Sequence, residues 1–148
     1  MKKLILFLFL LPSLLVAQTY FNVNFSGTFP PTGWTIDAHA GNWSAVSTNN
    51  SGGTAPEAMF NYSPTFTGDS RLISPAINTT GNTTITVEFK FMLDHYGGPY
   101  TIGAATRSGG GAWNVVWQKV NPTVSIPATT EIVTINNGDV GAADFQIC

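Results

Sequence analysis

Charged side chains are scarce in this chain of 148 residues. Asp, Glu, Lys and Arg make up 9% of it, against about 25% in an ordinary globular protein. Six residues are basic and eight are acidic. Nucleic-acid binding requires clusters of Lys and Arg that neutralise phosphates, and the sequence contains no such cluster. It therefore predicts no nucleic-acid partner.

Cysteine and long apolar runs are scarce as well. The single cysteine, Cys148, cannot form a disulfide within the chain, so the fold has to be stable without a covalent cross-link. The only unbroken apolar run of any length covers residues 4–11. A membrane-spanning helix needs about 20 such residues. We therefore expect no membrane-spanning segment.

The first seventeen residues have the order of a secretory signal peptide. Two lysines precede the apolar run, and small residues at Ser13 and Ala17 indicate cleavage after Ala17. We expect residues 1–17 to be removed and residues 18–148 to form one domain of a secreted or cell-surface protein. Without the two leader lysines, this domain has four basic and eight acidic residues, a net charge of −4.

Apolar residues do not recur with helical period anywhere, whereas short strand-like runs alternate with Gly, Pro and Asn. The clearest strand is residues 83–93. Its core-facing set is predicted to be Ile85, Val87, Phe89, Phe91 and Leu93, and its outward set Thr84, Thr86, Glu88 and Lys90. Nine weaker strands are predicted at residues 20–25, 34–37, 43–48, 57–62, 70–74, 100–107, 113–120, 131–136 and 144–148. The pattern predicts an all-β, two-sheet antiparallel β-sandwich.

Residues suited to catalysis are few. His39 and His95 are the only neutral-pH bases, and each lies close to an aspartate in the sequence. No nucleophile elbow, H-E-x-x-H helix, phosphate-binding loop or C-x-x-C pair accompanies them. The sequence favours a non-catalytic protein. Two carboxylates that meet only in the fold, as in glycoside hydrolases, are the alternative that it leaves open.

Aromatic side chains are the better candidates for ligand contact. Trp113, Val115 and Trp117 alternate in one strand-like run, which favours a shared core face. Trp43 follows a turn-like Gly-Asn pair, and Tyr96 lies in a predicted loop. Exposed aromatic rings stack against sugar rings. We therefore expect Trp43 and Tyr96 to bind the ligand.

Several segments together resemble a known family. They are residues 29–35 (FPPTGWT), 42–43 (NW), 52–58 (GGTAPEA), 71–81 (RLISPAINTTG), 89–96 (FKFMLDHY) and 100–102 (YTI). The chain resembles the cleaved-adhesin and choice-of-anchor domains of secreted bacterial proteins, from about residue 25 to residue 148. These domains are jelly rolls akin to the animal MAM domain, so the resemblance implies a sandwich of jelly-roll type.

The resemblance also implies a structural calcium ion. Glu57 matches the family's Pro-Glu and is the expected metal ligand, with Asn24 as the second. The family's opening strand carries Asp-Phe-Glu where this chain has Asn24, Phe25 and Ser26, a departure that removes two charges from a site that needs six to eight oxygen ligands. Glu57 as a solvated residue at the start of a strand is the alternative.

The expected function is a non-catalytic adhesion or carbohydrate-binding module of a larger secreted or cell-surface protein. Its partner would be an extracellular glycan or protein surface. The alternative is an accessory domain of a secreted protease or glycoside hydrolase, docked to the neighbouring catalytic domain. In the family a closing strand follows the position of Cys148. We therefore expect an incomplete jelly roll that lacks its last strand and has an unpaired sheet edge.

Overall fold

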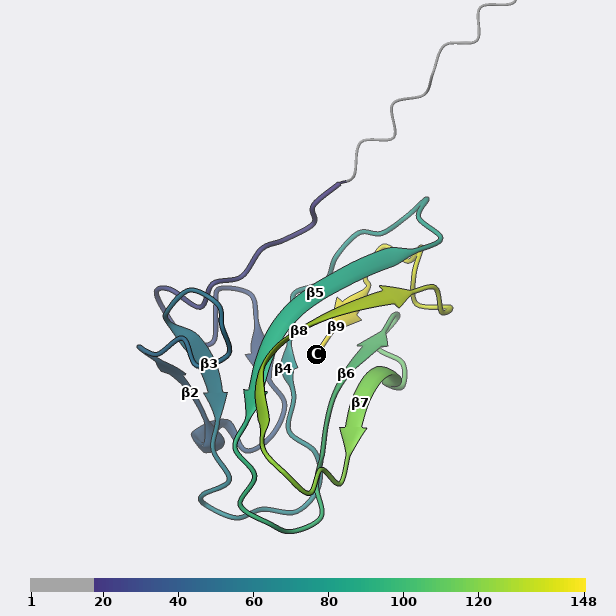
Figure 1. Ribbon diagram of the computed structural model, residues 1–148. Coiled ribbons are helices and arrows are strands. Elements are labelled where there is room, and N and C mark those ends of the chain that lie inside the picture. The colour runs from purple at the N-terminus through teal and green to yellow at the C-terminus, as the bar shows by residue number, and fades with distance from the viewer. Residues whose placement is uncertain (1–17) are drawn as a thin grey trace, which may run out of the picture.

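The computed structural model describes residues 18–148, whose regular secondary structure is almost entirely β (Figure 1). The predicted signal peptide, residues 1–17, lies outside the described residues. One short 3₁₀ turn, η1 (Ala40–Asn42), accompanies nine strands. The strands are β1 (Thr35–Ile36), β2 (Trp43–Val46), β3 (Glu57–Phe60), β4 (Leu72–Ile73), β5 (Ile85–Leu93), β6 (Thr101–Arg107), β7 (Asn114–Val120), β8 (Ile126–Ile135) and β9 (Gln146–Ile147). The all-β prediction is confirmed. Within residues 18–148, no helix is long and apolar enough to cross a membrane.

Nine of the ten predicted strands coincide with observed ones, and residues 20–25 do not. The prediction of a strand there is wrong: residues 20–25 pair with none of the described strands, and a cleft lies between this segment and β5. Strand β8 begins five residues earlier than predicted. Pro127, its second residue, lies where the register with β5 shifts between Ile126 and Thr129, and proline is tolerated at such an irregularity.

All strand pairs are antiparallel, and they form four small sheets. The orders are β1-β4, β2-β3, β5-β8 and β7-β6-β9. Strand β9 also contacts the chain at β4, because the amides of Ser74 and Ile77 donate to the carbonyls of Ile147 and Phe145, both at 2.8 Å. These bonds connect the β7-β6-β9 sheet with the β1-β4 pair.

The β5-β8 pair and the β7-β6-β9 sheet pack face to face. Ile135 of β8 forms a buried cluster with Phe145 and Ile147, and side chains of β5 and β7 lie against it. Phe89 and Phe91 pack edge-on to Trp117, with ring centroids 5.0 and 5.1 Å apart. The predicted inner and outer faces of β5 are confirmed by its alternating burial. The strand order of a jelly roll stays a prediction.

A β-bulge interrupts the pairing of β6 with β7. Ala104 lies opposite Trp117 and Ala105 opposite Val115, so Val116 has no partner. Val116 packs against the buried cluster and Trp117 against β5, whereas Val115 is 61% exposed. The prediction that Trp113, Val115 and Trp117 share a core face is therefore wrong. Side chains alternate between the two faces of a strand. The extra residue shifts this alternation by one, so the side chains before Val116 point to the opposite face from the one that an unbroken strand would give them.

One buried carboxylate holds the β6–β7 hairpin in place. Asp139, 6% exposed, accepts hydrogen bonds from Thr106 Oγ1 at 2.6 Å, Asn114 Nδ2 at 2.9 Å and Ser108 Oγ at 3.2 Å. Burial raises the pKa of Asp139, but these hydrogen bonds outweigh it and leave the pKa below its ordinary value of 3.8. The carboxylate is thus ionised and connects both strands of the hairpin to the loop after β8.

Candidate functional site

Four rings gather where η1 meets the β2–β3 hairpin. Trp43 lies directly across from Phe60 in the hairpin, with ring centroids 4.8 Å apart. Phe66 packs edge-on to Phe60 at 5.4 Å and lies against the ring of His39 at 4.3 Å. We call His39, Trp43, Phe60 and Phe66 the hairpin aromatic cluster.

Polar contacts fix the position of this cluster. Trp43 Nε1 donates to Ser70 Oγ at 2.8 Å, and that hydroxyl donates to the carbonyl of Ala38 at 2.6 Å. The buried side chain of Asn42 donates to the carbonyls of Asn61 and Pro64, at 2.7 and 2.8 Å. These bonds hold the indole at one orientation and tie the chain after β3 to η1.

The cluster is open to solvent on one side. Phe60 is 40% exposed, and Tyr62, two residues further along, is 66% exposed. Trp43 itself is half-buried. Tyr96, the second predicted ligand contact, is 88% exposed in the loop between β5 and β6. No ring contact joins Tyr96 to the cluster among the described residues, so the two predicted contacts lie in separate surroundings.

Glu57, the predicted metal ligand, holds the loop of the β2–β3 hairpin. Its carboxylate accepts hydrogen bonds from Thr48 Oγ1 at 2.6 Å, from the Asn50 amide at 2.8 Å, and from the amide and hydroxyl of Ser51 at 2.9 and 2.6 Å. Burial raises the pKa of Glu57, but the hydrogen bonds from Ser51, Thr48 and Asn50 dominate and lower it from 4.5 to about 2. The loop is therefore built around an ionised carboxylate.

Asn24, the other predicted metal ligand, lines the same cleft as Glu57. This cleft of about 710 Å³ lies between residues 21–25, the β2–β3 loop and β5. Asn24 Oδ1 accepts hydrogen bonds from the amide and hydroxyl of Ser26, at 3.1 and 2.7 Å. Within residues 18–148, no three His, Cys, Asp or Glu side chains form a group that could hold a metal ion. Calcium at this cleft would need further oxygens from backbone and water.

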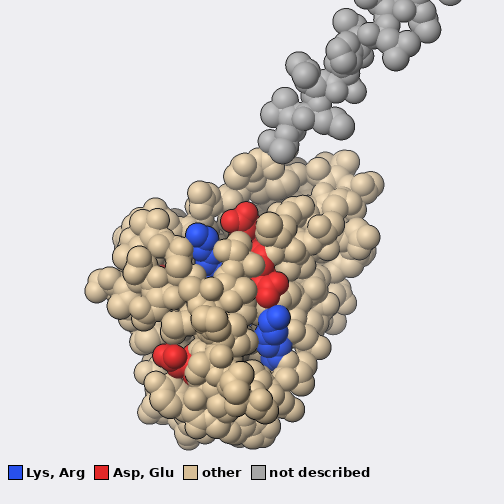
Figure 2. Space-filling view, in the orientation of Figure 1, with Lys and Arg blue, Asp and Glu red and all other residues tan. Residues whose placement is uncertain are grey.

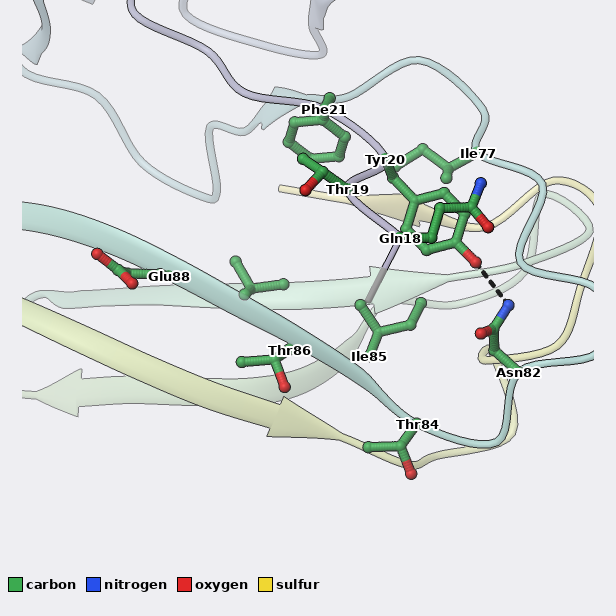
Figure 3. Close-up of a pocket in the computed structure, with 11 residues that line it drawn as sticks. Gln18, Thr19, Tyr20, Phe21, Ile77, Asn82, Thr84, Ile85, Thr86 and Glu88 are labelled. Atoms are coloured by element: carbon green, nitrogen blue, oxygen red, sulfur yellow. Dashed lines mark hydrogen bonds between the residues drawn. The ribbon is translucent and has the colours of Figure 1, made fainter. Parts of the chain in front are cut away.

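A second cleft, of about 660 Å³, lies next to the first along the same segment and shares Phe21, Val87 and Glu88 with it. Figure 3 shows residues 18–21 on one wall and the beginning of β5 on the other, with the Tyr20 hydroxyl accepting a hydrogen bond from Asn82 Nδ2. Ile77 and Ile85 contribute apolar surface, and Glu88 is its one charged residue. Both clefts lie between residues 18–25 and β5, and these residues form no ladder with β5.

Replacing Glu57 with Gln should destabilise the fold by about 1–2 kcal/mol at pH 7, because an amide can accept fewer of the four hydrogen bonds. A carboxyl group whose pKa is lowered on folding stabilises the protein above its unfolded pKa, and this stabilisation is lost as the pH falls. In the wild type we expect the loss between about pH 4.5 and pH 2, and none from this position in the variant. Urea denaturation of both proteins at pH 7 and across this pH range measures the stability difference and its pH dependence. The exposed Glu88→Gln is the control, and an equal effect there would contradict the prediction.

The two histidines have no Ser, Thr or Cys hydroxyl or thiol bonded to their rings within residues 18–148. His95 Nδ1 lies 2.8 Å from the Tyr100 hydroxyl, and His39 contacts Phe66 through its ring. Asp37, which the sequence placed near His39, instead pairs with Arg71 at 2.9 Å. The described histidines therefore take part in packing and in one hydrogen bond with a phenol.

Comparisons of the chain with protein-family models, with curated proteins and with solved structures found no match.

The sequence identifies Trp43, but it does not indicate that Phe60, Phe66 and His39 form a cluster with it. Phe60 lies in one predicted strand and Trp43 begins another, so the signal is the hairpin that joins them. Pairing residues 43–46 with residues 57–60 sets these two rings side by side. Phe66 gave no such signal, because it lies in an irregular segment.

Proposed function

We propose that the chain is an exported, non-catalytic adhesion or carbohydrate-binding module of a larger secreted or cell-surface protein, related to the cleaved-adhesin and choice-of-anchor domains. The observation that supports this best is the hairpin aromatic cluster, with its open side at Phe60 and Tyr62. Apolar rings held in fixed positions beside polar groups suit the faces and hydroxyls of sugars. Tyr96 adds a freely accessible ring on another loop.

Calcium belongs to this proposal as a structural ion. Glu57 and Asn24 face a common cleft and would supply carboxylate and amide oxygens. Since the Glu57 oxygens already accept four hydrogen bonds, calcium would replace part of this set. Melting curves in calcium and in chelator, with the wild type and with Glu57→Gln, test it. A calcium-dependent rise in melting temperature that the variant lacks supports the ion. If the wild type melts identically in calcium and in chelator, calcium is not part of the structure and the proposal loses this ion.

Glycan binding tests the main proposal. The purified protein is screened on immobilised neutral glycans, and the best ligand is titrated against Phe60→Ala and Tyr96→Ala. Loss of a stacked ring should weaken binding by about tenfold, which corresponds to about 1.4 kcal/mol. Val120→Ala is the control, because Val120 is 57% exposed on β7, away from the cluster. Its affinity should equal that of the wild type.

The outcomes separate the functions. Tenfold weaker binding by Phe60→Ala, with Val120→Ala unchanged, supports the cluster as the binding surface. Full affinity in both aromatic variants would contradict its role. Absence of binding to every glycan, combined with binding to an isolated protease or glycosidase domain, would favour the accessory-domain alternative.

A further inference from the structure

A second aromatic surface lies on the outer face of the β7-β6-β9 sheet. The β-bulge leaves Val115 opposite Ala105 and Asn114 opposite Thr106, so Trp113 comes next to Arg107 on the outward side. Arg107 lies opposite Gln146 of β9. Trp113, Arg107 and Gln146 therefore form a row across three segments of this layer, and we call this row the arginine–tryptophan patch. Figure 1 shows β6 and β7 side by side in this part of the molecule.

Arg107 is stacked on the indole. Its guanidinium carbon lies 4.4 Å from the centroid of the Trp113 ring, within the range of a cation–π contact. Its Nε donates to Gln146 Oε1 at 2.9 Å, and Gln146 Nε2 donates in turn to the carbonyl of Ser74 at 2.9 Å. The guanidinium is thus held by a ring on one side and by an amide that is itself fixed to the backbone.

Arg107 differs from the other basic side chains of the described chain in its hydrogen-bond and ion-pair partners. Arg71, whose guanidinium carbon lies 5.9 Å from the centroid of the same Trp113 ring, pairs with Asp37 and Asp69, and Lys119 pairs with Glu131 at 3.3 Å. Lys90 donates to the carbonyl of Gly52. Arg107 forms no ion pair with any described acid, and its two terminal nitrogens donate to no described group. Lys and Arg side chains of any kind are few on the face of the molecule that Figure 2 shows.

This combination suits a carboxylate. A guanidinium keeps its N–H donors in its own plane, and two parallel donors match the two oxygens of a carboxylate. Because Nε is occupied and the ring covers one face, the terminal nitrogens are the donors left for a ligand. Val115, exposed on the same outer face, adds apolar surface beside the indole. A rigid sugar ring that bears a carboxylate can use both the donors and the apolar surface.

We propose that the arginine–tryptophan patch is a binding site for the carboxylate of an acidic sugar, within a polysaccharide of uronic acids. This inference rests on the proposed glycan-binding role and names the ligand class for a surface separate from the hairpin aromatic cluster. Residues 18–148 carry a net charge of −4, so a polyanion is repelled at long range. Affinity must therefore come from the short-range contacts of Arg107. For this reason we expect the substitution of this one residue to have a large effect on binding.

Titration with polygalacturonate tests the inference, and its fully methyl-esterified form is the matched neutral ligand. We expect binding to the acid form only. Arg107→Gln should weaken it by about tenfold or more, and Arg107→Lys should weaken it nearly as much, because a lysine keeps the charge but lacks the two parallel donors. Lys119→Gln is the control, since Lys119 also lies over a tryptophan, Trp117, but is engaged by Glu131. It should bind as the wild type does.

Thermal melting of each variant separates a binding defect from a folding defect, and Arg107→Lys serves as the milder variant if Arg107→Gln unfolds. Equal affinity for the esterified polymer, an unchanged affinity in Arg107→Gln, or an equal loss in Lys119→Gln would each overturn the inference. If neutral glycans bind at the hairpin aromatic cluster and polygalacturonate does not bind, this inference fails while the proposed function stands. If no glycan of either kind binds, both fail.

Discussion

Replacing Phe145 with alanine is expected to destabilise the fold by about 3–5 kcal/mol, the usual cost of deleting a buried ring. Phe145 is 1% exposed and lies in the buried cluster with Ile135 and Ile147. The described residues contain only six buried apolar side chains, so little other core remains to hold the layers together. Since small domains have a total stability of about 5–15 kcal/mol, we expect a lost or much weakened cooperative transition in urea.

Two variants make this result specific. Phe145→Leu keeps most of the apolar volume and should cost less than half as much as the alanine variant. Val124→Ala removes an apolar side chain that is 68% exposed, and its stability should lie within about 0.5 kcal/mol of the wild type. A Phe145→Ala protein as stable as Val124→Ala would show that the two layers are held together elsewhere.

The second large effect is expected at Asp139. Asp139→Ala leaves the donors of Thr106, Asn114 and Ser108 without their acceptor in a buried place, which should cost about 3 kcal/mol. Because the pKa of Asp139 is lowered on folding, its contribution is complete above the unfolded pKa and is lost as the pH falls through the folded value. The difference between the two proteins should therefore shrink in acid, as urea denaturation at pH 7 and below pH 3.8 would show.

Asp144 offers the matched control for this prediction. It accepts a hydrogen bond from the Gly109 amide at 2.9 Å, so it contacts the same hairpin, but its side chain is exposed. Asp144→Ala should cost about 0.5–1 kcal/mol. If it costs as much as Asp139→Ala, burial of the carboxylate is not the source of the effect.

The sequence predicts the strands well where one face of a strand meets the core. Residues 83–93 alternate without a break, and the observed strand β5 has the predicted inner and outer sides. Residues 20–25 have a similar but weaker pattern and form no strand. The difference is long-range: a strand exists only if another edge approaches it, and no local pattern contains that information.

The candidate sites show the same limit. Trp43 was recognised from its turn-like neighbours, but its partners come from a strand fourteen residues later and from an irregular segment. The resemblance predicts Glu57 as a metal ligand, whereas its carboxylate is enclosed by donors of the preceding loop. Those donors are Thr, Asn and Ser, residues that are common in loops and give no distinct signal. The alternation of Trp113 with Trp117 predicts a shared core face, and the bulge that separates the two rings depends on the partner strand, which no local pattern shows.

The spacing of two tryptophans is a mark by which related sequences can be sorted. Trp113 and Trp117 have three residues between them, and in an unbroken strand this even separation places both rings on the same side. Here they lie on opposite sides, because Val116 is the unmatched residue. A relative with only two residues between its tryptophans would reach the same arrangement with a regular strand. A relative that lacks one residue at this point would thus keep the two rings on opposite faces without a bulge. In an alignment, a one-residue gap between the tryptophans would therefore mark a relative in which the bulge is absent.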